Sequence, residues 1–167
     1  AHATSTFGYA NKATNEASTA FGYQSEATGS YSFAGGYKSK ANGQGATALG
    51  YFNTAAEGAA AFGNSSNASG KNSFAAGVSS WADGEGSVAI GNSAEADGIS
   101  SSAFGAAVVA EGDYSFAAGT DSYATGNSSV ALGNASEAKG DYSFDELCEI
   151  VRHQLRLQTN RNELNSM

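Results

Sequence analysis

The side chains that most often carry acid–base, nucleophilic or metal chemistry are few in this chain and have no recurring spacing. Its two histidines, His2 and His153, lie near opposite ends, and no histidine recurs near a serine, cysteine or carboxylate at a catalytic spacing. Its one cysteine, Cys148, cannot form an intrachain disulfide and leaves the redox compartment undecided. We therefore expect a protein that is not an enzyme.

The charged residues exclude several further classes. Aspartates occur at no fixed phase, whereas a calcium-binding β-roll needs Gly-Gly-x-Gly-x-Asp nonapeptides, so we expect neither a metal nor another cofactor. The formal net charge is −8, and residues 1–144 contain five lysines and no arginine against twelve acidic residues. A phosphate backbone is a poor partner for such a surface, so nucleic acid is not expected.

The elements that position these residues are marked by glycine. The chain has 22 glycines and no proline, which excludes collagen and proline-rich linkers. Ten glycines each close a short run of small and apolar residues, at a spacing of 14 residues eight times and 13 once. Such a period predicts a stack of near-identical coils, because glycine tolerates the positive φ of a repeated corner. These are Gly8, Gly22, Gly36, Gly50, Gly63, Gly77, Gly91, Gly105, Gly119 and Gly133.

One coil is predicted to contain two short strands of about five residues, each ended by glycine. In the first strand, 87–91, Val88 and Ile90 share one face and small residues share the other. In the second, 93–98, Ala94 and Ala96 point inward while the residues between them point to solvent. Only small side chains then meet inside the coil, so the large ones must point out of it.

The large side chains form compensating pairs at three and one positions before each repeat glycine. Alternating bulk along a stack is what close packing at a tight axis requires, so the stripe predicts the core of a cyclic oligomer, most simply a homotrimer. A monomer rarely exposes so long an apolar stripe. The pairs are Thr19/Phe21, Phe33/Gly35, Thr47/Leu49, Ala60/Phe62, Phe74/Ala76, Val88/Ile90, Ser102/Phe104, Phe116/Ala118 and Val130/Leu132.

The period is disturbed at two places. Between Gly50 and Gly63 the second turn glycine, Gly58, comes one place late, which predicts a bulge or a shortened turn. After residue 144 the repeat stops, and the tail 145–167 has leucines and an isoleucine at heptad spacing. We expect a repeat domain at 1–144 and a non-repeat tail that is either a short helix beginning a stalk or an unrelated end.

The motifs Gly-Ser-Val-Ala-Ile-Gly (86–91) and Ser-Ser-Val-Ala-Leu-Gly (128–133) resemble the head domain of YadA-like trimeric autotransporter adhesins. The resemblance covers about residues 1–144. It implies an all-β, left-handed parallel β-roll that is homotrimeric. It also implies a virulence-associated adhesin on the outer membrane of a Gram-negative bacterium, binding host extracellular matrix protein such as collagen. The family's neck often begins Asp-Arg-Glu-Asn, and here only Asp145 matches.

Ligand-binding residues are predicted in two groups. In some family members the repeat motif is implicated in collagen binding, which implies Ser87, Val88, Ala89, Ile90, Gly91, Ser129, Val130, Ala131, Leu132 and Gly133. The packing argument instead assigns the large members of that set to the subunit core. Bulky apolar residues at outward positions of the second strand form the other group: Trp81, Val109 and Tyr123.

The alternative function is a structural spacer in a surface fibre or a phage tail fibre, with no binding activity of its own. No apolar run approaches the roughly 20 residues needed to span a bilayer, so we expect no direct membrane insertion by these residues. A signal peptide or membrane anchor is not seen in this sequence and is expected elsewhere if the protein is exported.

Overall fold

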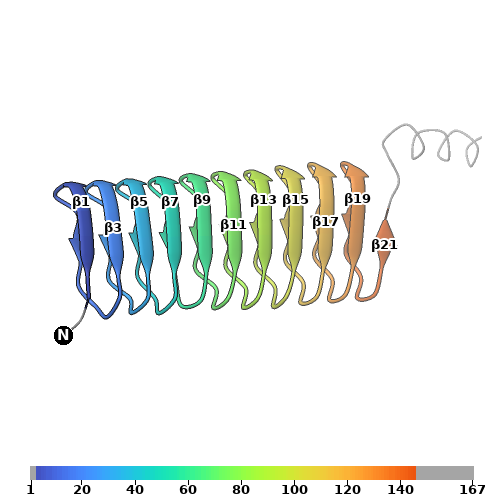
Figure 1. Cartoon of the computed structure of the whole chain (residues 1–167). Coiled ribbons are helices and arrows are strands. Elements are labelled where there is room, and N and C mark those ends of the chain that lie inside the picture. Colours follow the sequence, from blue (N-terminus) through green and yellow to red (C-terminus); the bar gives the residue numbers. More distant parts are fainter. Residues whose placement is uncertain (1–2, 146–167) are drawn as a thin grey trace, which may run out of the picture.

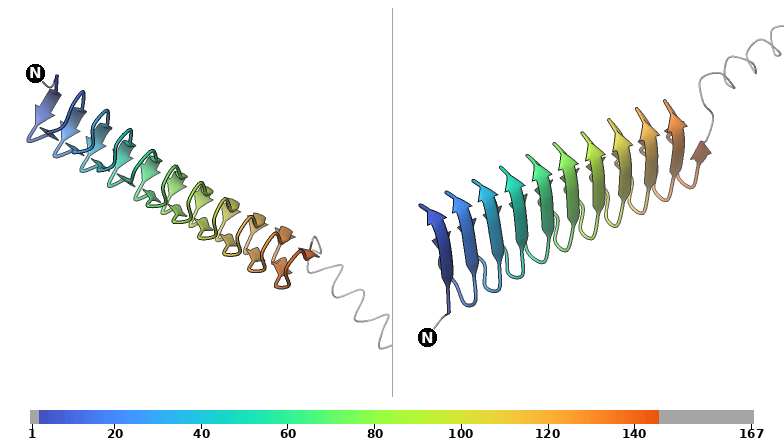
Figure 2. Two further views of the ribbon diagram at one scale, coloured as in Figure 1. Left: turned by 90° about the horizontal axis from the view of Figure 1, so that it is seen from below. Right: turned by 45° about the horizontal axis from the view of Figure 1, so that its top comes forward.

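The computed structural model describes residues 3–145 as an all-β parallel solenoid of about ten coils, with no helix in that range. Figure 1 shows the coils side by side, and Figure 2 shows that they follow one another along a single axis. Each coil gives one strand to each of two sheets. The predicted parallel stack of coils is therefore confirmed.

The two sheets differ in strand length. The longer strands form an eleven-stranded sheet: β1 (Ser5–Tyr9), β3 (Thr19–Tyr23), β5 (Phe33–Tyr37), β7 (Thr47–Tyr51), β9 (Ala60–Asn64), β11 (Phe74–Val78), β13 (Val88–Asn92), β15 (Ser102–Ala106), β17 (Phe116–Thr120), β19 (Val130–Asn134) and β21 (Phe144–Asp145). The shorter strands form a ten-stranded sheet: β2 (Lys12–Ala13), β4 (Glu26–Ala27), β6 (Lys40–Ala41), β8 (Thr54–Ala55), β10 (Asn67–Ala68), β12 (Trp81–Ala82), β14 (Glu95–Ala96), β16 (Val109–Ala110), β18 (Tyr123–Ala124) and β20 (Glu137–Ala138).

The second strand of each coil is shorter than predicted. It has two residues, as in β14, and not about five. The cause is the corner before it, where Ser93 adopts a left-handed conformation with φ 54° that no strand residue has. The backbone N–H of Ser93 donates to the carbonyl of Val78 in the preceding coil at 2.9 Å, which compensates for the cost of this conformation.

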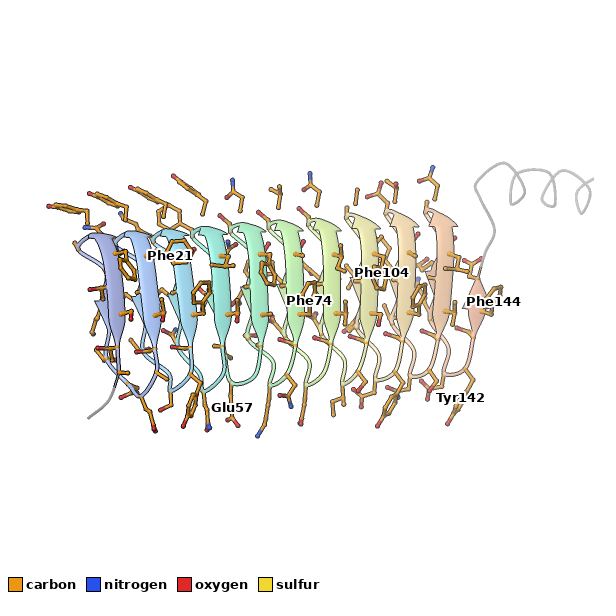
Figure 3. All side chains as sticks on the ribbon, viewed as in Figure 1. Phe21, Glu57, Phe74, Phe104, Tyr142 and Phe144 are labelled. Atoms are coloured by element: carbon orange, nitrogen blue, oxygen red, sulfur yellow. The ribbon has the colours of Figure 1, made fainter. Side chains whose placement is uncertain are left out.

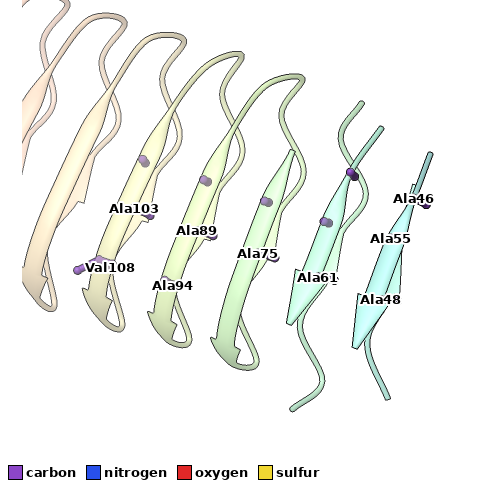
Figure 4. Close-up of a cluster of buried hydrophobic side chains, with 14 of the residues drawn as sticks. Ala46, Ala48, Ala55, Ala61, Ala75, Ala89, Ala94, Ala103 and Val108 are labelled. Carbon is purple, nitrogen blue, oxygen red and sulfur yellow. The ribbon is translucent and has the colours of Figure 1, made fainter. Parts of the chain in front are cut away.

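The space between the sheets is filled by small side chains, as predicted. Ala89 of β13 and Ala96 of β14 are completely buried, and the same positions of neighbouring coils stack above and below them. Figure 4 shows Ala89, with Ala75 and Ala103 of the neighbouring coils, lying between the two layers. The largest buried side chains in the described residues are Val108 and Asn53. Close approach of the two sheets therefore leaves no interior room for an aromatic ring.

Asn53 shows how a polar group is accommodated in this interior. Its amide donates to the carbonyls of Leu49 at 2.7 Å and Gly63 at 2.8 Å, and its side-chain oxygen accepts the N–H of Ser66 at 2.8 Å. Serine occupies the same position in several other coils, for example Ser80, whose hydroxyl donates to Gly91 at 2.9 Å. The buried polar side chain thus links one coil to the next.

Glycine is required at both corners, for different reasons. Gly91 has φ 146°, as the sequence predicts, and a Cβ there would also lie 1.8 Å from the carbonyl oxygen of Gly105 in the next coil. Gly98, at the second corner, has no such φ, but a Cβ there would lie 2.1 Å from the carbonyl oxygen of Gly112 in the next coil. The stacking distance of the coils therefore excludes a side chain at either corner.

The disturbed coil contains a shortened turn. Three residues separate Ala55 from Ala59, where four separate Ala41 from Ala46 in the preceding coil. Both ladders continue through it unchanged, with Ala48 paired to Ala61 and Ala55 paired to Ala68. The turn is therefore one residue shorter and the strands are unaffected. Of the two expected alternatives, a bulge or a shortened turn, the structure has the shortened turn. The helix predicted in the tail 145–167 lies outside the described residues, except for Asp145, which ends β21.

Candidate ligand-binding surfaces

The outer face of the eleven-stranded sheet carries the apolar stripe, defined as the side chains three and one positions before each repeat glycine. Figure 3 shows Phe21, Phe74 and Phe104 projecting from this face. Large side chains of adjacent coils meet diagonally, with ring centroids of Phe21 and Phe33 at 5.2 Å and of Phe62 and Phe74 at 5.6 Å. The predicted outward direction of the large residues is therefore confirmed.

Compensation of bulk is visible in one pair of neighbours. Phe21 is paired across the ladder with Gly35, and a Cβ on Gly35 would lie 2.1 Å from the Phe21 ring. The ring thus occupies the space that a side chain at 35 would need. In a single chain the stripe is only half-buried, with Phe33 38% and Ile90 37% exposed. The stripe is therefore an extended apolar face that one chain does not cover.

The motif residues predicted to bind ligand are divided between the two sides of this sheet. Val88, Ile90, Val130 and Leu132 lie on the stripe, and Gly91 and Gly133 lie at its strand ends. Four small members of the set are 0% exposed inside the coil, so a ligand cannot touch their side chains and we correct the prediction for them: Ser87, Ala89, Ser129 and Ala131. Their small size is explained by packing between the sheets.

The second predicted group lies on the outer face of the ten-stranded sheet. Trp81, Val109 and Tyr123 occupy the same position of β12, β16 and β18, with Glu95 of β14 between the first two. Trp81 is 47% and Tyr123 41% exposed, and Val109 is half-buried. The structure thus brings these three residues together within four adjacent strands, on the opposite side of the roll from the apolar stripe.

Sequence reasoning missed a column of stacked rings at the ends of the first four long strands. Tyr9, Tyr23, Tyr37 and Tyr51 stack with centroid distances of 5.0–5.1 Å and interplanar angles of 4–12°. Phe52 packs edge-on against the last two rings at 5.4 and 4.7 Å. The signal was available, because each of these tyrosines directly follows a repeat glycine. We call these five residues the aromatic column.

Acidic side chains line one edge of the later coils. Asp83, Asp97 and Glu111 occupy the same turn position in three successive coils, and we call them the acidic ladder. Partial burial, followed by the charges of Asp83, Glu95 and Glu111, raises the pKa of Asp97 above its ordinary value. In residues 3–145 no three His, Cys, Asp or Glu side chains are grouped to hold a metal ion. The acidic ladder is therefore a repulsive feature of the fold.

Replacing Asp97 with asparagine should raise the melting temperature at pH 7. A carboxyl whose pKa is higher in the folded than in the unfolded state destabilises the fold above both pKa values and ceases to do so as the pH falls through the folded value. Asparagine imitates the protonated form, so the gain over the wild type should disappear in mild acid. Asp121→Asn, which removes the same charge outside the acidic ladder, is the control. Equal gains in both variants at pH 7 in thermal unfolding followed by circular dichroism would contradict this explanation.

The repeats match a known family model. The model of the YadA head domain repeat (2 copies) matches residues 13–39, 27–53, 55–80, 68–94, 82–107, 96–122 and 124–144, which is most of the chain. The chain belongs to the YadA head family. This confirms the resemblance stated above and makes the chain an adhesin-type head domain, in a family of cell-surface adhesins of Gram-negative bacteria that is not an enzyme family.

Two further findings bear on the YadA head assignment. No curated protein sequence matches the chain. Within the described residues, no helix has the length and apolar character needed to cross a bilayer. The apolar stripe and the exposed group around Trp81 are two candidate interaction surfaces of this YadA head.

Proposed function

We propose that this chain forms a left-handed homotrimeric head that binds host extracellular matrix protein of the collagen type through its outer surface. The observation that carries the trimer is the apolar stripe, which runs along the roll and is half-exposed in one chain. A cyclic assembly buries the same stripe of each copy at a common axis. Residues 1–144 act as the head, displayed from the bacterial outer membrane, and residues 145–167 begin the stalk.

In such a trimer the two predicted groups have different roles. The large motif residues Val88, Ile90, Val130 and Leu132 pack at the subunit core, and the glycines Gly91 and Gly133 set the corners. The opposite face stays in solvent, and there Trp81, Val109 and Tyr123 form a small apolar group among charged side chains. Exposed aromatic residues with polar surroundings are typical of interaction surfaces. We therefore assign matrix contact to this group.

The test measures binding of the purified chain to immobilised collagen and other matrix proteins by surface plasmon resonance. The variant Trp81→Asn/Tyr123→Asn should lose tenfold or more in affinity at unchanged assembly mass. Asparagine occurs naturally at the same position in Asn67, so the substitution suits the fold. Glu137→Asn, one strand beyond Tyr123, is the matched control and should bind normally.

Two results would overturn the proposal. Wild-type affinity in the Trp81/Tyr123 variant would mean that matrix protein is bound elsewhere. A wild-type chain that binds none of the matrix proteins would favour the alternative, a spacer module of a surface fibre or a phage tail fibre.

A further inference from the structure

A basic groove lies at the N-terminal end of the roll, between the corner that carries the aromatic column and the outer face of β2, β4 and β6. Lys12, Glu26 and Lys40 form its floor, and Gln24, Lys38 and Phe52 form the wall on the corner side. Its volume is about 470 Å³. Binding sites for small organic ligands typically have volumes of about 300–1,000 Å³, so the groove can hold a ligand of a few rings.

The charge of this groove differs in sign from the rest of the described chain. It has three lysines and one glutamate, whereas residues 53–145 contain two lysines and eleven acidic residues. Glu26 is 3.9 Å from Lys40, and no carboxylate of residues 3–145 lies within ion-pair distance of Lys12 or Lys38. Two ammonium groups are thus uncompensated, and an anion is attracted here and repelled elsewhere on the roll.

The lysines are held at defined separations. Lys12, Glu26 and Lys40 are in register on consecutive strands, so the two lysines stand two strand spacings apart, about 10 Å. Lys38 is placed by the aromatic column, with its Nζ 5.3 Å from the Tyr37 ring centroid and 5.5 Å from that of Phe52. Cation–π contacts of this length restrict the side chain before any ligand binds.

The groove also has an apolar wall. Phe52 is 44% exposed beside the ammonium groups, and its ring is fixed edge-on by Tyr37 and Tyr51. The four tyrosine rings of the aromatic column are stacked on one another at 5.0–5.1 Å, which leaves no slot for a nucleobase between them. A sugar ring needs only one aromatic face or edge for its C–H groups, and offers hydroxyls to Gln24 and acidic groups to the lysines.

We propose that the basic groove binds an acidic oligosaccharide, recognised by its sulfate or carboxylate groups at Lys12, Lys38 and Lys40 and by packing of a sugar ring against Phe52. The floor of the groove belongs to the ten-stranded sheet, opposite the apolar stripe, so assembly through the stripe leaves it accessible. The site is separate from the group around Trp81, which lies several coils away.

The experiment measures binding of a heparin-derived tetrasaccharide to the full chain by isothermal titration calorimetry. Lys12→Asn/Lys40→Asn should weaken binding at least tenfold, and Phe52→Ser several-fold. Asparagine occurs at the position of Lys12 and Lys40 in another coil, as Asn67, and serine occurs at the position of Phe52, as Ser65. Both variants are therefore expected to fold. The control Lys71→Asn/Lys139→Thr removes the same charge far from the groove and should change affinity less than twofold.

Three results would overturn the proposal: no binding by the wild type at 0.15 M salt, equal losses in the groove and control variants, or equally tight binding of a single-stranded oligonucleotide of the same charge. The last two would indicate attraction of any polyanion. Binding of matrix protein by the Lys12/Lys40 variant is expected to stay normal, so failure of this site and failure of the proposed matrix-binding function can be told apart.

Discussion

Replacing Ile90 with aspartate should dissociate the assembly or unfold it. Ile90 lies on the apolar stripe and is 37% exposed in one chain, and a trimer formed through the stripe would cover this exposed surface. An uncompensated carboxylate at such a place costs several kcal/mol, and a three-fold assembly contains three of them. Light scattering should give three times the 16.7 kDa of one chain for the wild type and a lower mass, or aggregated unfolded material, for the variant.

Glu95→Ala is the control for this substitution. Glu95 is exposed on the opposite sheet, so its removal should leave the mass unchanged and should not lower the melting temperature. The wild type should contain three copies both with residues 145–167 present and with them removed, because the stripe lies wholly within the repeats. Equal tolerance of both substitutions, or a monomeric wild type, would mean that the stripe is not the subunit interface.

Replacing Gly91 with alanine should disrupt the stack around it. The added Cβ would lie 1.8 Å from the carbonyl oxygen of Gly105, and φ 146° is outside the range of L-residues. The conformation alone costs about 1–3 kcal/mol, and relief of the overlap requires two coils to move apart and lose ladder hydrogen bonds. We expect a fall of more than about 3 kcal/mol in the free energy of unfolding, measured by urea denaturation.

Gly45→Asn is the matched glycine substitution. A Cβ at Gly45 meets nothing within 4 Å, and its φ of 67° is one that asparagine adopts, as Asn72 does at φ 58° in the corresponding turn. This variant should be within about 0.5 kcal/mol of the wild type, as expected of a surface substitution without strain. A Gly91→Ala variant as stable as Gly45→Asn would refute the account of the corner.

Most of the fold could be predicted because its determinants repeat. The spacing of the glycines predicted the length of a coil. The alternation around Ala89 and Ile90 predicted which side chains of the long strand point into the coil and which point out of it. The length of the second strand could not be predicted, because it depends on the left-handed corner residue before it. That residue is Ser93 in one coil and Ala107 in the next, so no residue type marks the corner. In both coils the backbone N–H of the corner residue donates to a carbonyl of the preceding coil, a contact that the sequence does not reveal.

The candidate surfaces could be predicted only in part. Trp81, Val109 and Tyr123 were found because the period-2 pattern assigns them to solvent. The motif residues Ser87 and Ala89 were included because the family resemblance treats the motif as a unit, whereas the strand alternation buries them. The basic groove was missed because its residues come from different strands and from corner positions that the sequence does not distinguish. Its lysines lie beside one another only when three coils are stacked.

The stacked ladders also determine how the rod carries a mechanical load. The hydrogen bonds between coils run along the axis of the stack, because every strand pairs only with its counterparts in the adjacent coils. Tension applied along that axis acts on the layers in series, so each layer bears the whole force and added coils do not share it. The rupture force of a single chain is then that of its weakest layer, and a longer head gains reach without gaining tensile strength.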